Sequence, residues 1–592
     1  MDLILDINIS KSIVISSLLF SNLYAAVLPV PEIDIGNIEP ERVGRVFTDK
    51  PRGIVAKDGK LVIPLLTQSL ELGDAKNYVF KLKKVNFVGN NAINSDELEG
   101  VYKPYYGKKI SLVKILELIH TTTIQYREAG YILSQAYLPA QDIDKNTGLI
   151  KIGIVEGYVN EVRISSDTIP YATKILLEQY GDRLRAERPI TKWTLERYAL
   201  LAKDLPGGDI KVVFSPSNRP GAADVEFIAD NQKIVAIEGL VDNRGTRLLG
   251  PIEFSGTMHQ FNGLYGNHTL FNAVRDDGTE LRVYNFNHRQ PLNSDGLALI
   301  VQVARTETDA NFNDLPRSIR PSVKINTPGI SKSVYAMFEY PFVRSRNLNL
   351  IADLKLDGYD TVTKFFGNKL FDEKIRALRA SLVVDWLDPY FYNILALTSI
   401  GIEFSHGLNN LGAKIIPALA TRPDTKENFN KIMATASRQQ PLLERLDLKL
   451  VIAGQYAFDE LISTEEYGYG GRDIGLGYDS YELSGDHGLV GKLELGYTMP
   501  IEKITKNISL LSNWGLQAFG FYDAGRVWNI NHRKSAQNSS DSAQSAGLGI
   551  RGKIFKYMNY ETYIAKPLAR KVQNQQSNDA RFFFVVGFAY PQ

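Results

Sequence analysis

The strongest constraint on the fold is an alternation of apolar and polar residues that recurs from about Lys233 to the C-terminus. Successive side chains of a β-strand point to opposite faces, so each such segment has one apolar face and one polar face. Helical periodicity is absent over the same span. The clearest examples are residues 347–357, 446–452, 492–497 and 582–590. Residues 233–592 are therefore expected to form antiparallel β-sheet.

The N-terminus carries an apolar segment that suits an export signal. Residues 12–27 (SIVISSLLFSNLYAAV) are interrupted by serine and asparagine and end in small residues that fit a signal-peptidase site. The segment is short for a spanning helix, which needs about 20 apolar residues. Signal peptides normally begin with positive charge, whereas Asp2 and Asp6 precede the lone Lys11 here. We predict a signal peptide over residues 1–26; a buried helix or an unusual start site is the alternative.

Alternating strands fit either a soluble sandwich or an outer-membrane barrel, because both have one apolar and one polar strand face. Three features favour the barrel: the export signal, the charged residues spread along one face of long strands, and the aromatic residues of segment 582–590. A spanning strand takes about 10 residues. The sequence therefore predicts a transmembrane antiparallel β-barrel over residues 233–592.

Composition excludes several classes of function. The 68 basic and 66 acidic residues give a formal net charge of +2, so nucleic-acid binding by bulk charge is not expected. The absence of cysteine excludes disulfides, thiolate catalysis and cysteine zinc sites. The seven histidines show no metal-binding or catalytic spacing, and no serine-nucleophile motif occurs. We predict no enzyme activity, no metal and no cofactor.

Two small α+β modules are predicted before the barrel. The first, over residues 78–159, combines a strand at 79–88, a helix capped by Ser111 that ends before Gly130, and strands at 131–138 and 149–155. The second, over residues 160–232, follows a similar plan. It begins with a strand at Val162 and continues with helices at 171–180 and 194–204, then strands at 210–214 and 224–228. Residues 27–77 are rich in proline and charge and are predicted to be a linker.

The most informative segment lies between two predicted barrel strands. Residues 467–488 (YGYGGRDIGLGYDSYELSGDHG) hold seven glycines in 22 positions, which permits close backbone approach and positive φ angles. A phosphate-binding loop would end in Gly-Lys-Ser/Thr, which is absent. The segment is therefore either a compact folded loop or an ordinary surface loop.

This segment, with residues 489–497 (LVGKLELGY) and 521–528 (FYDAGRVW), resembles the haemolysin secretion/activation group of outer-membrane transporters, which act in two-partner secretion. The resemblance extends to residues 205–207 (Leu-Pro-Gly) and to 242–250 at the entry into the barrel. It also covers a motif of the first polypeptide-transport-associated (POTRA) domain. Its residues are Tyr126, Gly130, Tyr131, Pro139, Gln141, Glu156 and Gly157.

The resemblance implies two POTRA domains followed by a barrel of sixteen strands, with a loop over residues 457–488 that enters the lumen. It also implies a plug helix, for which residues 39–47 are the candidate, although linker fits them equally. In the family an arginine of a Val-Arg-Gly-Tyr motif meets the aspartate of a Phe-x-Asp-x-Gly motif. Asp523 matches the aspartate, whereas Leu476 stands at the place of the arginine. We therefore predict that Arg472 replaces it and pairs with Asp523.

The predicted lock between the loop and the barrel includes the Arg472–Asp523 pair and nearby glycine, tyrosine and aspartate residues. Its residues are Gly471, Arg472, Gly475, Gly477, Tyr478, Asp479, Gly485, Asp486, Asp523 and Gly525.

The resemblance also implies the function. It predicts an outer-membrane protein whose POTRA domains capture an unfolded exoprotein in the periplasm and whose barrel secretes it. The exoprotein would be an adhesin, a haemolysin that is also activated, or a toxin, and the other partners would be outer-membrane lipids and no nucleic acid. The alternatives are an outer-membrane protein assembly or insertion factor of the same superfamily and a passive porin.

Overall fold

The computed structural model describes most of the chain beyond residue 77. The described residues are 29–30, 33–34, 78–143, 148–166, 168–229, 232–321, 325–389, 394–422, 424–500, 515–530, 540–555 and 557–590. The predicted signal peptide and the candidate plug segment 39–47 lie outside these residues. The two short strands β1 (Pro29–Val30) and β2 (Ile33–Asp34) pair in antiparallel fashion. No helix within the described ranges is long and apolar enough to cross a membrane.

The first module packs a long helix against a three-stranded sheet of order β4-β7-β6. Ser111 caps that helix as predicted, since its side chain accepts a hydrogen bond from the backbone N of Lys114 at 3.3 Å. The predicted strand 79–88 is two strands, because Lys83 N bonds to Gly148 O at 2.8 Å and turns the chain between them. The elements are β3 (Val79–Lys81), β4 (Lys84–Val88), α3 (Ser95–Glu99), η4 (Lys103–Tyr105), β5 (Lys109–Ser111), α4 (Leu112–Glu128), β6 (Gln135–Tyr137) and β7 (Leu149–Val155).

The second module packs two helices against a sheet of order β8-β10-β9. Its apolar core includes Leu176 and Leu184 from the first helix and Phe227 from the central strand, all fully buried. The first helix runs to Ala186, beyond the predicted end, because Leu184 continues its apolar face. The elements are β8 (Tyr158–Ser165), α5 (Tyr171–Ala186), α6 (Lys192–Lys203), β9 (Lys211–Pro216) and β10 (Ala222–Ile228).

Two backbone hydrogen bonds join the modules to each other. Lys192 N, at the start of α6, donates to Gly130 O at 2.7 Å, and Ile190 N donates to Gly157 O at 2.9 Å. Both acceptors belong to the predicted POTRA motif. Gly130 has a φ of +99°, a conformation that glycine adopts without strain, and it follows the end of α4. The motif glycines therefore build the joint between the modules.

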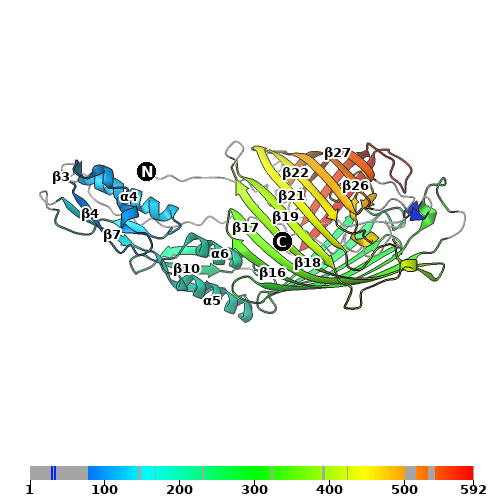
Figure 1. Ribbon diagram of the computed structural model, residues 1–592, viewed down its shortest axis with the longest axis horizontal. Helices are drawn as coiled ribbons and strands as arrows, with labels where there is room; N and C mark the ends of the chain where they lie inside the picture. Colours follow the sequence, from blue (N-terminus) through cyan, green and yellow to red (C-terminus); the bar gives the residue numbers. More distant parts are fainter. Residues whose placement is uncertain are drawn as a thin grey trace.

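The remaining chain forms a closed antiparallel barrel of sixteen strands plus the two-residue β20, counted over the described residues (Figure 1). Strand β29 closes the ring on β11, with a register that runs from Ile237↔Tyr590 to Asp242↔Val585. The strands are β11 (Val235–Asp242), β12 (Glu253–Phe261), β13 (His268–Asp276), β14 (Leu281–Pro291), β15 (Ala298–Asp309), β16 (Pro328–Arg344), β17 (Leu348–Phe365), β18 (Asn368–Asp388), β19 (Ala396–Gly407), β20 (Lys414–Ile415), β21 (Asn430–Leu443), β22 (Leu446–Ala457), β25 (His487–Thr498), β26 (Gly515–Trp528), β27 (Ser540–Ile554), β28 (Met558–Pro567) and β29 (Arg581–Tyr590).

The predicted alternation is confirmed along these strands. On β17, Leu354 and Leu356 are exposed on the outer surface, whereas Tyr359 and Thr361 are buried inside the barrel. On β29, Phe582 and Phe588 are exposed, and Phe583 is buried. The barrel thus presents an apolar band to its surroundings and polar groups to its lumen, as expected of a membrane barrel.

The second module is docked on one end of the barrel, where the chain passes from β10 into β11 (Figure 1). Asp204, next to the end of α6, accepts two hydrogen bonds of 2.7 Å from the nearly buried guanidinium of Arg344 on β16. The predicted Leu-Pro-Gly segment lies at the same interface between the second module and the barrel. Pro206 O accepts from the Asn262 side chain, and Gly207 O accepts from Lys233 N at 2.7 Å.

Candidate functional site: a buried loop in the barrel lumen

The glycine-rich segment is a compact, buried hairpin inside the barrel. It follows β22 and contains η7 (Ser463–Glu465), β23 (Tyr467–Tyr469) and β24 (Leu483–Gly485), and β23 and β24 pair with each other. Both strand tyrosines are fully buried. Gly470 and Gly471 have φ values of +113° and +126° at the turn, and a Cβ on Gly470 would lie 2.2 Å from Asp479 O. Of the two readings left by the sequence, the structure shows the compact folded loop.

Asp523, on β26, holds the middle of this hairpin. Its fully buried carboxylate accepts hydrogen bonds from Tyr469 Oη at 2.7 Å, from Ser545 Oγ at 2.6 Å and from the backbone N of Leu476 at 3.1 Å. All three donors are neutral, and two belong to the loop. The predicted pair of Arg472 with Asp523 is therefore wrong. The loop keeps its bond to the aspartate through a backbone amide at the position where the family has its arginine.

Leu476 explains this difference, because its side chain is committed elsewhere. It packs into an apolar cluster on the barrel wall with Phe519, Phe521 and Tyr563. Its peptide N–H points toward Asp523, and its carbonyl accepts from Arg244 at 3.1 Å.

Arg472 binds a different pair of carboxylates, at the start of the barrel. Its guanidinium donates to Asp242 at 2.5 and 3.1 Å and also to Glu253, which lie at the end of β11 and the start of β12. Arg244, from the same connection, donates to Gly471 O in the loop and to Tyr563 Oη on β28. Asp242 also accepts from Arg244 N at 2.9 Å. The loop tip is thus bonded to β11, which closes the barrel on β29, and to the neighbouring strand β12.

The other predicted loop residues contact the wall from several sides. Asp479 pairs with Arg581 on β29 at 2.6 Å, and Gly477 N donates to Ser545 Oγ at 3.0 Å. Tyr478 Oη donates to the carbonyl of Gln544 at 3.1 Å. Gly475 has a φ of +78° next to the turn. The loop is therefore bonded to β26, β27 and β29 as well as to β11 and β12.

Two of the predicted glycines allow close packing of the loop against the barrel. A Cβ on Gly525 would lie 2.2 Å from the ring of Tyr469, and a Cβ on Gly485 would lie 2.8 Å from Trp528 O. Because Tyr469 also donates to Asp523, the glycine at position 525 allows that hydrogen bond to form.

Gly525→Ala is expected to displace Tyr469 and expose the loop. The added methyl group overlaps the tyrosine ring, and overpacking of this kind costs about 1–3 kcal/mol. We expect faster cleavage of residues 458–486 by added protease in cells that display the assembled barrel. Gly256→Ala on β12 is the matched control, because a Cβ there meets nothing within 4 Å. Equal cleavage in the two variants would contradict this packing argument.

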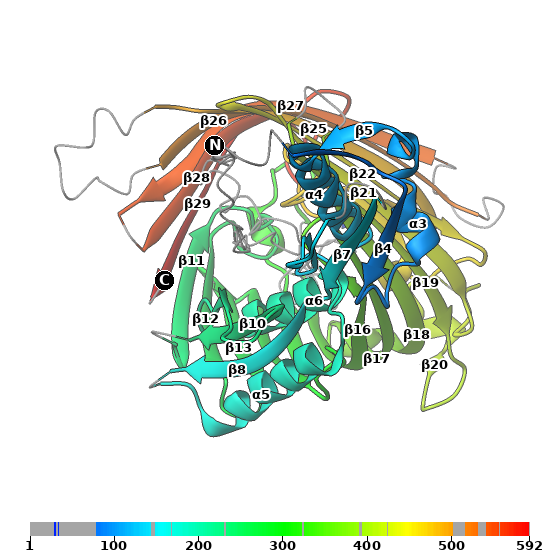
Figure 2. The ribbon, with the colours of Figure 1, turned by 90° about the vertical axis from the view of Figure 1, so that its left-hand side faces the viewer.

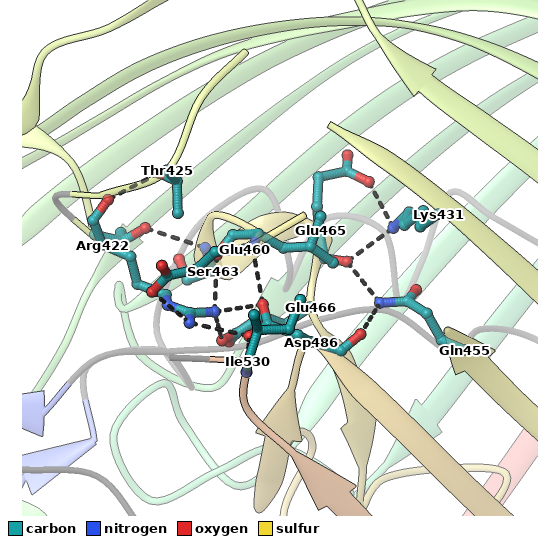
Figure 3. Close-up of polar contacts among 12 residues, drawn as sticks. Arg422, Thr425, Lys431, Gln455, Glu460, Ser463, Glu465, Glu466, Asp486 and Ile530 are labelled. Atoms are coloured by element: carbon teal, nitrogen blue, oxygen red, sulfur yellow. Dashed lines mark hydrogen bonds and ion pairs between the residues drawn. The ribbon is translucent and has the colours of Figure 1, made fainter. Parts of the chain in front are cut away.

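Asp486 anchors the base of the hairpin through a buried charged cluster (Figure 3). Its carboxylate accepts from Arg422 at 2.6 and 3.0 Å, from Leu461 N at 2.8 Å and from Ile530 N at 2.9 Å. Arg422 also binds Glu466 at 2.5 Å and Glu460 at 2.8 Å. Arg422 comes from the connection between β20 and β21, so this cluster joins a second barrel-end segment to the loop.

Glu465 forms a second buried cluster at the same end. Its carboxylate is bound by Arg379 on β18 at 2.8 Å and by Lys431 on β21 at 2.6 Å. Tyr359 Oη on β17 donates to it at 3.1 Å. Glu465 is fully buried, as are two of its three strand partners, Lys431 and Tyr359. Such paired charges satisfy each other, and removal of one partner would leave an isolated buried charge.

Sequence reasoning missed most of the partners on the barrel wall. Asp242 and Arg244 lie inside the segment that resembles the barrel entry, and Arg581 immediately precedes the predicted segment 582–590, but no contact with the loop was predicted for any of them. Arg379 and Lys431 lie on β18 and β21, for which no individual strand was predicted, so nothing indicated their contact with Glu465. Arg422 lies in an irregular connection, where no sequence signal indicates a contact.

The predicted POTRA motif residues are structural in the first module. Glu156 accepts hydrogen bonds from Ala92 N at 2.6 Å and from Tyr126 Oη at 3.1 Å. Burial of Tyr126 raises the pKa of its phenol, and the nearby Glu156 carboxylate raises it further. Gln141 bonds to both backbone groups of Lys151, at 2.7 and 2.8 Å. The remaining motif residues belong to the turns around these contacts. Tyr131 N bonds to Tyr126 O, Pro139 O accepts from Gln141, and Gly157 N donates to Ser134 Oγ.

Comparisons with known proteins agree with this architecture. Residues 80–157 match the model of the ShlB-type POTRA domain, and residues 313–552 match that of the haemolysin secretion/activation protein family ShlB/FhaC/HecB. The heme/hemopexin transporter protein HuxB of Haemophilus influenzae is 23% identical over 507 residues, which cover 84% of this chain and 85% of that protein. The outer membrane transporter CdiB of Dickeya dadantii is 19% identical over 481 residues and covers 80% of each chain.

Solved structures share the fold. CdiB from Escherichia coli superposes with a TM-score of 0.71 at 17% identity and covers 89% of this chain and 93% of that chain. CdiB from Acinetobacter baumannii gives a TM-score of 0.60 at 17% identity and covers 87% and 90%. The protein therefore has its barrel in the outer membrane and its POTRA region in the periplasm. With both family models matched in chain order, the chain belongs to the haemolysin secretion/activation family of two-partner secretion transporters.

Proposed function

We propose that this protein captures an unfolded exoprotein in the periplasm and secretes it through its barrel. The observation that carries the proposal is the buried hairpin. It is bonded to opposite parts of the barrel wall through Asp523, Arg472 and Asp486. A passive porin needs an open polar channel, whereas this hairpin occupies the lumen. That arrangement supports a channel that opens only for its cargo.

Capture is proposed to occur at exposed strand edges of the periplasmic modules. Each module has a three-stranded sheet with two outer strands, whose free N–H and C=O groups can pair with an extended chain. Strand β8, with eight residues, is the longest of these edge strands. Folding of the cargo outside the cell would make its return unfavourable, so no nucleotide hydrolysis is required.

The cargo is proposed to be a secreted protein with its own N-terminal secretion segment. HuxB is named as a heme/hemopexin transporter and CdiB as an outer membrane transporter. An adhesin, a haemolysin or a toxin would each suit a transporter of this family. Activation of a haemolysin during secretion is part of the proposal, and it is tested by comparing the lytic activity of cargo secreted through this protein with that of the same cargo purified from cells that lack it. No catalytic step by the transporter is proposed.

Deletion of residues 78–156 tests the proposal. The deletion removes the first module and leaves β8, which belongs to the sheet of the second module. We expect loss of the cognate exoprotein from the culture medium, measured by immunoblot, with the barrel still present in outer-membrane fractions. Normal secretion by this variant would contradict the proposed role of the module. A cargo encoded beside this protein is the first to test.

A further inference from the structure

Helix α5 of the second POTRA domain lies along the periplasmic rim of the barrel. Three residues along the helix bond to the β12–β13 and β14–β15 connections. These bonds are Gly266 N to Thr173 Oγ1 at 3.1 Å, Tyr265 Oη to Gln179 Oε1 at 2.5 Å, and Arg183 to Asp295 at 2.8 Å. A helix held at three successive points by the turns of neighbouring strands runs beside the rim, rather than away from it into the periplasm.

The helix lies on the outer side of that rim. Seen from the periplasmic end, α5 is at the outer edge of the ring of strands, and α6 lies inward of it, next to β16 (Figure 2). The outer surface of the strands above it is the lipid-facing band, where Phe271 on β13 and Tyr284 on β14 are exposed. The space next to α5 on its outer side is therefore where the periplasmic leaflet meets the barrel.

The exposed side chains at this place suit a membrane interface. Tyr171, at the start of α5, is 78% exposed, and Leu264, in the β12–β13 turn that α5 contacts, is 66% exposed. Leu292, in the β14–β15 turn, is 44% exposed. Lys174 is exposed one helical turn after Tyr171. Tyrosine and long basic side chains favour the level of lipid headgroups, where an apolar body and a polar end are both accommodated.

We propose that α5 rests on the phospholipid surface of the periplasmic leaflet, with Tyr171 and Leu264 inserted at the headgroup level and Lys174 facing lipid phosphates. The lipid band of the barrel then continues onto the second POTRA domain. Lipid contact at this surface would hold the domain against the membrane, in addition to the contacts that the domain makes with the barrel. The surface binds phospholipid rather than the exoprotein.

Site-specific quenching in nanodiscs tests this proposal on the full-length protein. Because the chain contains no cysteine, Tyr171→Cys and Leu264→Cys each give one labelling site for a fluorophore. The nanodiscs hold phosphatidylethanolamine and phosphatidylglycerol, with or without a phospholipid that carries a nitroxide near its headgroup. Phe271→Cys, on the lipid-facing surface, is the positive reference. Val88→Cys, which is 59% exposed on β4 of the first POTRA domain, is the negative reference.

We expect quenching at positions 171 and 264 within about twofold of that at position 271, because interfacial side chains lie at the depth of the nitroxide. Position 88 should not be quenched. Quenching at position 264 alone would mean that α5 stands clear of the leaflet and would overturn the proposal. Quenching at neither position beyond the level of position 88 would also overturn it. Neither outcome depends on secretion, so the result is separate from the test of the transporter function.

Discussion

Replacement of Asp523 by alanine is expected to release the lumen hairpin and raise the conductance of the barrel. The carboxylate accepts from Tyr469, Ser545 and the amide of Leu476, all of which are buried. A buried donor left without an acceptor costs about 1–3 kcal/mol, so the loss of three is large compared with typical effects of single substitutions. Planar-bilayer recording should show larger and more frequent openings, and secretion of the cognate exoprotein should fall.

Two further variants make this result specific. Asp523→Asn keeps an acceptor oxygen of similar size and is expected to show a smaller rise in conductance than the alanine variant. Asp579→Ala, in an exposed turn, removes a carboxylate of the same type without touching the hairpin and should behave like the wild type. Conductance of Asp523→Ala at the wild-type level would show that this carboxylate does not hold the hairpin in the lumen.

Removal of Arg422 is expected to have the second large effect. Its guanidinium is the shared partner of Asp486, Glu466 and Glu460, and the first two carboxylates are fully buried. Breaking a buried pair by removing one partner costs on the order of 3–5 kcal/mol. Arg422→Ala should lower the temperature at which the barrel loses its folded mobility on gels. It should also expose the connection between β20 and β21 to protease on whole cells.

The matched control is Arg317→Ala, which changes an exposed arginine in another connection at the same end of the barrel. This variant should keep the unfolding temperature and protease resistance of the wild type. Arg422→Lys should fall between the two, because a single ammonium cannot reproduce the several directed bonds of the guanidinium. An Arg422→Ala barrel as resistant as the control would mean that the carboxylates reorganise at little cost.

The barrel could be predicted because its signal is periodic. Alternation along β17 and β29 identifies lipid-facing residues such as Leu354 and Phe582 from the sequence alone. The break between β3 and β4 was not predicted, although the adjacent Lys83 and Lys84 interrupt the alternation of residues 79–88. That break follows from a hydrogen bond between Lys83 and Gly148, more than sixty positions apart in the chain.

The site was predictable as a region and not as a set of contacts. Glycine content identified the hairpin, and the motif identified Asp523 as its partner. The assignment of Arg472 to Asp523 relied on charge and nearness in sequence, but hairpin geometry places that guanidinium at Asp242 and Glu253 instead. Long-range polar contacts depend on three-dimensional placement, which one-dimensional periodicity does not contain. The backbone amide of Leu476 takes the place of the family's arginine side chain at Asp523, and every residue has such an amide, so the sequence cannot indicate this contact.

The joint between the two periplasmic modules has a mechanical consequence. Two peptide groups at the joint bond directly to peptide groups of the next domain, through Lys192 to Gly130 and Ile190 to Gly157, and the far end of α6 is clamped by Asp204 to Arg344. Backbone hydrogen bonds on both sides of the joint resist bending between the two modules, and the Asp204–Arg344 ion pair connects α6 to the barrel. An exoprotein that pulls on the outermost module would therefore exert a force on β16 at the periplasmic end of the barrel.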